Sequence, residues 1–180
     1  MLYFITGNKN KFTEAKKEMF PIELVQKEID LIEIQSLDSK EVISHKLKEA
    51  TKHFSGELIV EDVSFTLDAM NGLPGPLIKF FLNSIGRKGI YDLCKSFNNF
   101  NAEAKATIGY TDGKEVLFFE GIVKGKVVEP IVESGFGWDS IFVPEGFDKT
   151  FAEMQLEEKN KISHRGKALK KFKEYYLNKK

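Results

Sequence analysis

The 180-residue sequence contains a single cysteine, Cys94, and no histidine–cysteine spacing typical of a zinc site. An intramolecular disulfide is therefore excluded, a cytoplasmic location is expected, and any bound metal has to be held by oxygen. The sequence also lacks an apolar run of the roughly 20 residues that a membrane-spanning helix requires. Its first residues, MLYFITGN, lack the basic and apolar regions of a secretion signal, so we expect neither membrane insertion nor secretion.

An excess of charge of one sign is absent as well, because 27 basic residues balance 27 acidic ones. This balance excludes the broad basic surface expected of a protein that coats polymeric nucleic acid or binds an anionic membrane. Arginine is scarce, since only Arg87 and Arg165 supply the planar donor group in a chain that otherwise uses lysine. The apolar content of 42% suffices for a core, and no repeat or linker divides residues 1–180, which predicts a single domain.

The spacing of apolar residues predicts a mixed β-sheet with flanking helices. Strands are predicted over residues 2–5, 24–34, 57–60, 102–110 and 116–128, and helices over residues 12–19, 39–55, 77–86, 90–97 and 163–180. Alternation along residues 102–110 and the turn residues Asp112 and Gly113 indicate an antiparallel hairpin. The expected fold class is therefore α/β, with parallel strands beside a hairpin region.

A glycine-containing turn between the first strand and the first helix has the features of a phosphate cradle. The turn comprises Thr6, Gly7, Asn8, Lys9, Asn10 and Lys11. Glycine permits close approach of an anion, the helix N-terminus offers N–H groups, and lysines neutralise charge. The turn is not a Walker loop, because it lacks the four-residue spacer and the Gly-Lys-Ser/Thr ending. The alternative is an ordinary strand-to-helix turn in a lysine-rich protein.

Carboxylates follow two of the predicted strands, where open α/β sheets place their ligands. Glu33 ends the second extended segment, and Glu61 and Asp62 come directly after the strand at residues 57–60. Hard oxygen ligands near a polyphosphate site favour Mg²⁺, which orients water and offsets charge. Either carboxylate alone would more often be a solvated acid at the end of an element.

Two further segments offer groups that recognise a nucleobase. Phe136, Gly137, Trp138 and Asp139 combine an aromatic face with a carboxylate in an open backbone. Ser163, His164 and Arg165 begin the last helix, and the Arg165 guanidinium is expected to donate to purine ring acceptors. The alternatives are core aromatic residues and a helix start that Ser163 merely caps.

Taken together, these segments resemble the inosine triphosphate pyrophosphatases, the Ham1 family of dITP/XTP pyrophosphatases. The resemblance rests on TGNKNK, VEDVSF, GLPGPLIKFF, FGWDSIFVP and FAEM with EKNKISHR, which occur in that order along nearly the whole chain. It implies an elongated, two-lobed α/β protein with the substrate cleft between the lobes and pairing as a homodimer. It also implies hydrolysis of deaminated purine nucleoside triphosphates (ITP, dITP, XTP) to the monophosphate and pyrophosphate, which cleanses the nucleotide pool.

The resemblance assigns roles residue by residue. Asp62 would accept the proton of the attacking water, and Glu33 and Asp62 would bind Mg²⁺. Residues 6–11, Lys79 and Lys159 would hold phosphates, whereas residues 136–139, His164 and Arg165 would form the purine pocket. The chain departs from the family at Val63, a substrate-contact position where Ser or Thr usually follows the catalytic aspartate, and Ser64 points elsewhere on a strand.

Two alternatives to this activity are considered. A nucleotide pyrophosphatase of the Maf type would prefer modified or pyrimidine bases, and the SHR and FGWD segments count against it. A catalytically silent nucleotide sensor would keep the cradle and the base pocket without turnover, and the intact Glu33 and Asp62 count against that.

Overall fold

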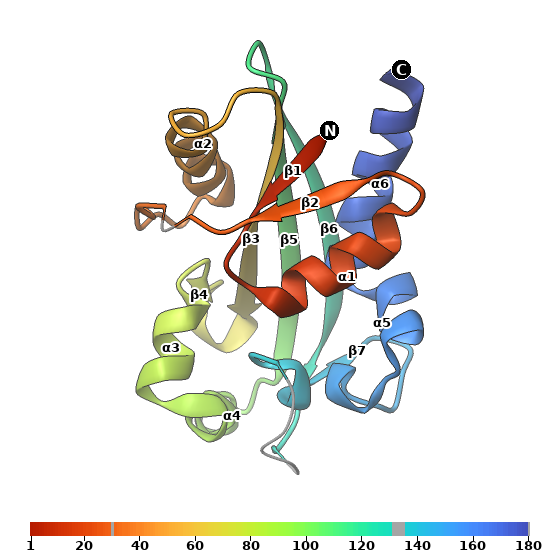
Figure 1. Cartoon of the computed structure of the whole chain (residues 1–180). Coiled ribbons are helices and arrows are strands. Elements are labelled where there is room, and N and C mark those ends of the chain that lie inside the picture. Colours follow the sequence, from red (N-terminus) through yellow and green to blue (C-terminus); the bar gives the residue numbers. More distant parts are fainter. Residues whose placement is uncertain (30, 131–135, 180) are drawn as a thin grey trace.

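A seven-stranded mixed sheet runs through the computed structural model, which describes residues 1–29, 31–130 and 136–179. The strand order is β2-β1-β3-β5-β6-β7, and β4 pairs with β3 outside this path. The strands are β1 (Leu2–Ile5), β2 (Leu24–Lys27), β3 (Glu57–Leu67), β4 (Pro74–Gly75), β5 (Asn101–Thr111), β6 (Val116–Val127) and β7 (Phe142–Pro144). Figure 1 shows the long strands β3, β5 and β6 side by side along the molecule.

Six α-helices and three short 3-10 helices flank this sheet in the described residues. The α-helices are α1 (Lys9–Met19), α2 (Ser39–Ala50), α3 (Ile78–Ser84), α4 (Gly86–Ser96), α5 (Leu156–Ile162) and α6 (His164–Lys179). The 3-10 helices are η1 (Asp68–Met70), η2 (Asp139–Ile141) and η3 (Phe151–Glu153). Among the described residues, no helix combines the length and the apolar character needed to cross a bilayer.

The mixed sheet expected from the sequence is confirmed. Strand β1 pairs in parallel with both β2 and β3, whereas β5 pairs antiparallel with β3 and with β6. Parallel neighbours require crossover connections, and helices α1 and α2 lie within them. The antiparallel part is the predicted hairpin, with Asp112 and Gly113 in its turn.

Two boundaries near the site differ from those predicted, and some short elements were not predicted. Strand β3 continues to Leu67, so Glu61 and Asp62 lie within it rather than after its end, because β5 keeps pairing beyond the last residue paired with β1. Strand β2 ends at Lys27, so Glu33 lies in the connection that leads to α2, and Asp30 lies outside the described residues. Helix α5 and strand β7 were not predicted because both are short.

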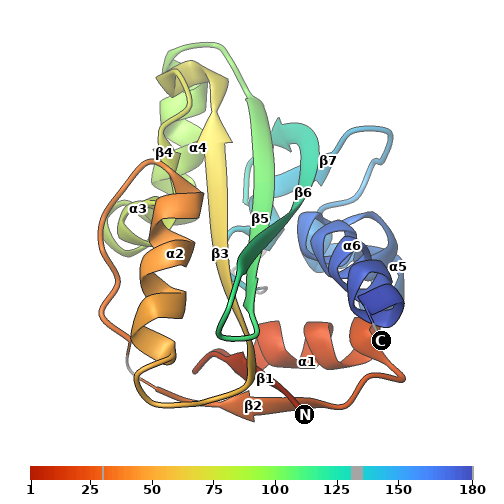
Figure 2. The same ribbon diagram turned by 90° about the horizontal axis from the view of Figure 1, so that it is seen from above.

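Helices cover both faces of the part of the sheet that contains β1 and the first half of β3. Figure 2 shows α2 on one side and α1 and α6 on the other. Successive residues of β3 serve the two faces in alternation. Leu58 and Val60 pack with Leu47 of α2, whereas Ile59 belongs to the cluster that includes Phe172 of α6. The sheet is therefore buried on both faces, as parallel strands require.

A separate hydrophobic cluster fills the other end of the molecule. Phe65 at the far end of β3 packs there with Cys94 of α4, with Trp138 and with Phe142 of β7. Strands β3 and β5 contribute to the clusters at both ends, so the two lobes share one continuous sheet. The candidate site lies between these clusters.

Helix α6 crosses β6 at Gly121 without space for a side chain. A Cβ atom there would lie 2.0 Å from the His164 carbonyl oxygen and 2.5 Å from the Ala168 nitrogen. Because both neighbours are backbone atoms of one helix, a methyl group would push α6 as a unit away from the sheet.

We expect Gly121→Ala to lower the free energy of unfolding by about 1–3 kcal/mol, since overpacking a closed contact costs that much. Urea denaturation measures this change. Lys124→Ala, at an exposed position of the same strand, is the control and should change stability by less than about 0.5 kcal/mol. Equal stability of both variants would contradict the close approach of α6 to β6.

Candidate active site

A cleft of about 930 Å³ opens between the two lobes. Its walls come from the β1–α1 turn, the connection after β2, helix α2, the middle of β3, helix α3, the turn before η2 and the start of α6. Most of the residues singled out in the sequence line it: Thr6, Gly7, Asn8, Lys11, Glu33, Asp62, Val63, Lys79, Phe136, Gly137, Trp138, Asp139, His164 and Arg165. Segments far apart in the chain thus meet in one cavity.

The β1–α1 turn forms one end of the cleft. Asn8 caps helix α1, since its side-chain oxygen accepts a hydrogen bond from the Lys11 backbone nitrogen at 3.1 Å. The Asn8 backbone N–H donates to the Thr6 hydroxyl at 3.1 Å, which closes the turn. Of the predicted cradle, Lys9 and Asn10 are exposed and do not line the cleft, because they lie on the outward face of the first helical turn.

A carboxylate pair, Glu33 and Asp62, lines the cleft and is joined by a lysine that sequence reasoning did not assign. The buried Lys46 ammonium lies 2.8 Å from Glu33 Oε1 and 3.5 Å from Asp62 Oδ1. One cation therefore already bridges the two predicted metal ligands. Asp62 Oδ2 is buried and has no hydrogen-bond partner among the described residues.

The electrostatic surroundings make these carboxylates unlike each other. Burial raises the pKa of Asp62, and the nearby Lys46 and Lys11 charges only partly oppose this effect. Burial also raises the pKa of Glu33, but its hydrogen bond and charge interaction with Lys46 outweigh burial and lower it overall. Two oxygen ligands with one free buried oxygen fit a hard divalent cation that keeps most of its waters. No group of three or more metal-ligating side chains occurs in the described residues.

The turn before η2 forms the aromatic end of the cleft. Phe136 and Gly137 are half-buried, whereas Trp138 is only 5% exposed and stacks on Phe65 with ring centroids 4.4 Å apart. Phe65, from the hydrophobic cluster at the far end of β3, therefore covers one face of the Trp138 ring. Phe136 is the more open aromatic residue.

The Arg165 guanidinium is directed at carboxylates. Its Nε donates to both oxygens of Glu61 at 3.1 and 2.9 Å, one terminal nitrogen donates to Glu61 at 2.9 Å, and the other binds Glu14. Arg165 is 2% exposed, so carboxylates already engage most of its donor group, although Arg165 also lines the cleft. Only the second N–H of each terminal nitrogen remains for another acceptor.

These contacts belong to a longer series of alternating charges, here called the ion chain. It runs Lys11, Glu61, Arg165, Glu14, Lys159 and Asp139. Lys159 lies 2.9 Å from Glu14 and 2.6 Å from Asp139, is 5% exposed and does not line the cleft. Two carboxylates hold the Lys159 ammonium behind the cleft wall, and the predicted contact of Lys159 with phosphate stays a prediction.

Burial raises the pKa of each acidic member, but the net shifts differ in direction because the neighbouring cations oppose burial to different extents. Burial raises the pKa of Glu61, yet the Arg165 and Lys11 charges dominate and lower it to about 2. The same opposition, with Arg165 and Lys159, lowers the pKa of Glu14. Burial raises the pKa of Asp139 despite Lys159. Beside the chain, burial lowers the pKa of His164 well below 6.5, so its imidazole is neutral.

Lys46 and Glu14 are two charged residues of the site region that sequence reasoning did not assign. Both carried a signal, because each charged side chain lies on the apolar face of a helix. Lys46 follows Ile43 by three residues and precedes Ala50 by four, and all three are buried. Val63 lines the cleft as expected, whereas Ser64 is 3% exposed and does not, so its hydroxyl does not replace the missing contact.

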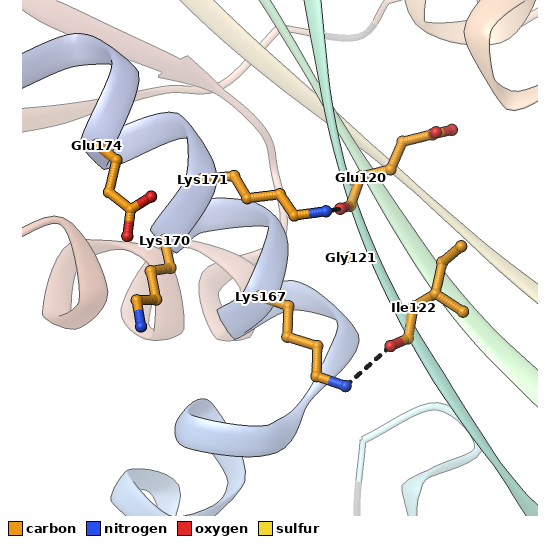
Figure 3. A pocket seen from close by; sticks show the side chains of 7 residues that line it. All are labelled: Glu120, Gly121, Ile122, Lys167, Lys170, Lys171 and Glu174. Atoms are coloured by element: carbon orange, nitrogen blue, oxygen red, sulfur yellow. Dashed lines mark hydrogen bonds between the residues drawn. The ribbon is translucent and has the colours of Figure 1, made fainter. Parts of the chain in front are cut away.

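A second cavity, of about 490 Å³, lies between β6 and α6 (Figure 3). Three lysines of α6 line it, and two of them are already bound: Lys171 donates to the Glu120 carbonyl at 2.7 Å and Lys167 to the Ile122 carbonyl at 3.0 Å. No paired carboxylates or aromatic face accompany these lysines, so this cavity lacks the chemistry of the first.

The ion chain should make stability depend on pH in the acid range. The folded-state pKa values of Glu14 and Glu61 lie below the ordinary 4.5, so their contribution is complete above about pH 4.5 and is lost as the pH falls toward 2. Glu14→Gln should lower the free energy of unfolding by about 3–5 kcal/mol near pH 7 and reduce the loss on acidification. Urea denaturation at about pH 7, 5 and 3 measures both effects.

Glu23→Gln removes the same charge at an exposed position and is the matched control. It should keep the wild-type stability near pH 7 and the wild-type loss in acid. An acid loss in Glu14→Gln as steep as that of the wild-type protein would show that the ion chain does not contribute to stability as its geometry indicates.

Comparison with known proteins supplies the context for this geometry. The sequence model of the Ham1 family matches residues 2–175. The inosine triphosphate pyrophosphatase of Pyricularia oryzae is 44% identical over 176 residues, which cover 96% of this chain and 92% of the relative. That of Schizosaccharomyces pombe is 44% identical over 177 residues, covering 97% and 94%.

Solved structures agree in fold. The HAM1 protein of Coxiella burnetii superposes with a TM-score of 0.84 at 23% identity, covering 99% of this chain and all of that one. A structure described as a nucleoside-triphosphatase/dITP/XTP pyrophosphatase, from Mycobacterium abscessus, has a TM-score of 0.71 at 26% identity and covers 96% and 98%. Family match, sequence identity and fold thus agree over nearly the full length, and the chain belongs to the Ham1 family.

Proposed function

We propose that this protein hydrolyses nucleoside triphosphates to the monophosphate and pyrophosphate, and that deaminated purine nucleotides (ITP, dITP and XTP) are its substrates. The names of its relatives support this activity. One observation of the structure carries it: a single cleft is lined by a lysine-bearing turn, a carboxylate pair and an aromatic turn. These three parts correspond to the triphosphate, the reacting phosphorus and the base of one nucleotide. Removal of such nucleotides would cleanse the nucleotide pool.

Lysines and backbone groups provide for the triphosphate. Such a group carries about four negative charges, which point charges and N–H donors neutralise well. Lys11 and Lys79 lie at the cleft surface, and Thr6, Gly7 and Asn8 present the turn before α1. Lys46, held between two carboxylates, is a further cation within the same cavity.

Asp62 is the proposed proton acceptor for the attacking water. Its burial raises its pKa, and a higher pKa makes a carboxylate a better base near neutral pH. Its free, buried oxygen is the natural position for that proton. Water then forms the new bond to phosphorus while pyrophosphate leaves.

Glu33 and Asp62 are the proposed ligands of Mg²⁺. When bound, the ion would offset charge on the triphosphate and on the leaving pyrophosphate. The ligand set supports this choice, because two carboxylates plus substrate phosphates suit Mg²⁺ and no cysteine lines the described cleft.

The turn before η2 and the start of α6 are the proposed base pocket. Phe136 offers a stacking surface, and Gly137, Trp138 and Asp139 complete the wall. Neutral His164 and the remaining N–H groups of Arg165 are the polar groups for a 6-oxo purine. An adenine amino group would leave buried donors unpaired, at about 1–3 kcal/mol each, which favours ITP over ATP.

A homodimer and a cytoplasmic location stay predictions, as does the absence of a polymeric nucleic-acid partner. Membership of the Ham1 family disfavours the Maf-type alternative. A pyrophosphate-release assay with ITP tests the silent-sensor alternative. A sensor would bind ITP without releasing pyrophosphate, whereas the proposed enzyme would release it.

Asp62→Asn should lower turnover of ITP by about 10²-fold or more, because an amide cannot accept the proton and is a weaker metal ligand. Turnover is measured by pyrophosphate release at saturating Mg²⁺, with the far-ultraviolet circular dichroism and melting temperature as checks of folding. A folded variant that retains more than about half of the wild-type turnover would exclude Asp62 as the base.

Lys11→Ala should raise KM for ITP and lower kcat/KM by about tenfold, since a charge that faces the triphosphate is lost. Its KM should also depend less on ionic strength. Lys9→Ala is the matched control, because Lys9 lies two residues away, is exposed and does not line the cleft. Similar kinetics of the two variants would place Lys11 outside the phosphate site.

A further inference from the structure

Arg87 is one of only two arginines in the chain, and none of the roles described above uses it. It lies in the first turn of α4, and its Nε donates to the Gly137 carbonyl at 2.7 Å. The two residues are 50 positions apart in sequence. The bond therefore joins helix α4, which packs in the cluster at the far end of β3, to the turn that lines the aromatic end of the cleft.

The conformation of that turn explains why an external donor meets it. Gly137 has φ +57°, in the left-handed region that suits glycine. The carbonyls on either side bond within the segment: Phe136 accepts from the Asp139 N–H and Trp138 from the Ile141 N–H, both at 3.0 Å. The Gly137 carbonyl instead receives the charged side chain of Arg87. Bonds to a charged donor are stronger than neutral ones, so this contact constrains the tip of the turn.

The position of the turn decides the width of the cleft at its aromatic end. Phe136 and Trp138 flank the bonded glycine and both line the cleft. Helix α3, which packs with α4, supplies Lys79 and Phe80 to the cleft. Arg87 therefore links the helical pair that forms one wall to the turn that forms another.

We propose that Arg87 is a positioning residue for base selection: by holding the Gly137 carbonyl it fixes the turn at residues 136–139 in the place that favours a 6-oxo purine. Arg87 does not line the cleft, so it acts through the turn rather than on the substrate. Its effect should fall on the base end and leave the phosphate end unchanged. This inference rests on the proposed pyrophosphatase function.

The kinetic test uses Arg87→Ala, Arg87→Lys and the control Lys88→Ala. Lys88 is the next residue on α4, is exposed and pairs with Asp92, so its loss removes a similar charge without touching the turn. Initial rates with ITP and with ATP give kcat and KM for each protein. Inorganic tripolyphosphate, which has no base, is measured as a competitive inhibitor of ITP hydrolysis.

Arg87→Ala should lower kcat/KM for ITP by about tenfold and that for ATP by about twofold, so the preference for ITP narrows. The inhibition constant of tripolyphosphate should stay within about twofold of wild type, since the phosphate end is intact. Arg87→Lys should recover part of the preference, because an ammonium can donate one bond but lacks the planar group. Lys88→Ala should match wild type.

The single tryptophan gives a second readout that does not depend on catalysis, because Trp138 is the neighbour of Gly137. In Arg87→Ala the quenching of its fluorescence by acrylamide should increase, as the released turn exposes the ring. Addition of IMP should restore part of the protection. Lys88→Ala should show wild-type quenching in both states.

Two outcomes would overturn the inference while leaving the proposed function in place. The first is an equal fall of the ITP and ATP rates in Arg87→Ala together with unchanged Trp138 quenching. The second is a weaker inhibition of Arg87→Ala by tripolyphosphate, by a factor as large as the fall in its kcat/KM for ITP. Failure of the proposed function is distinguishable, because the wild-type protein itself would then release no pyrophosphate from ITP.

Discussion

Desolvated charge is the constraint on which the arrangement of the cleft depends. The ion chain brings together side chains of α1, β3, η2, α5 and α6, and its central members are almost wholly buried. A buried ion tolerates few positions, because losing its partner leaves an uncompensated charge in a medium that solvates it poorly. Elements that carry these groups therefore have to meet in one way, and the same meeting forms the walls of the cleft.

This constraint also separates the two kinds of cation in the site. Arg165 and Lys159 are each held by two carboxylates and work within the protein. Lys11, at the end of the ion chain, is bound to one carboxylate, Glu61, and Lys79 is exposed. Charges of the first group fix shape, whereas those of the second remain available to an anion. A chain with no net charge can thus bind a polyphosphate through local placement of its lysines.

Local patterns sufficed to predict much of this structure from the sequence. The period of apolar residues identified the hairpin of β5 and β6, and the turn before α1 was recognisable from Gly7 and the following lysines. The partners of Arg165 were not predictable in this way, since 151 residues separate it from Glu14 and 104 from Glu61. Sequence spacing carries no record of such pairs, so the carboxylate partners of Arg165 and Lys159 were not predicted.

The lysines that line the second cavity have a consequence of another kind. Along residues 116–122, one side of β6 is bound to β5 and no described strand pairs with the other. Lys167 and Lys171 bind two carbonyls of that open side. Because these carbonyls already accept hydrogen bonds and lie beside several positive charges, a further strand would pair poorly with this edge. Helix α6 thereby protects the protein against edge-to-edge association of its sheets, and hence against aggregation.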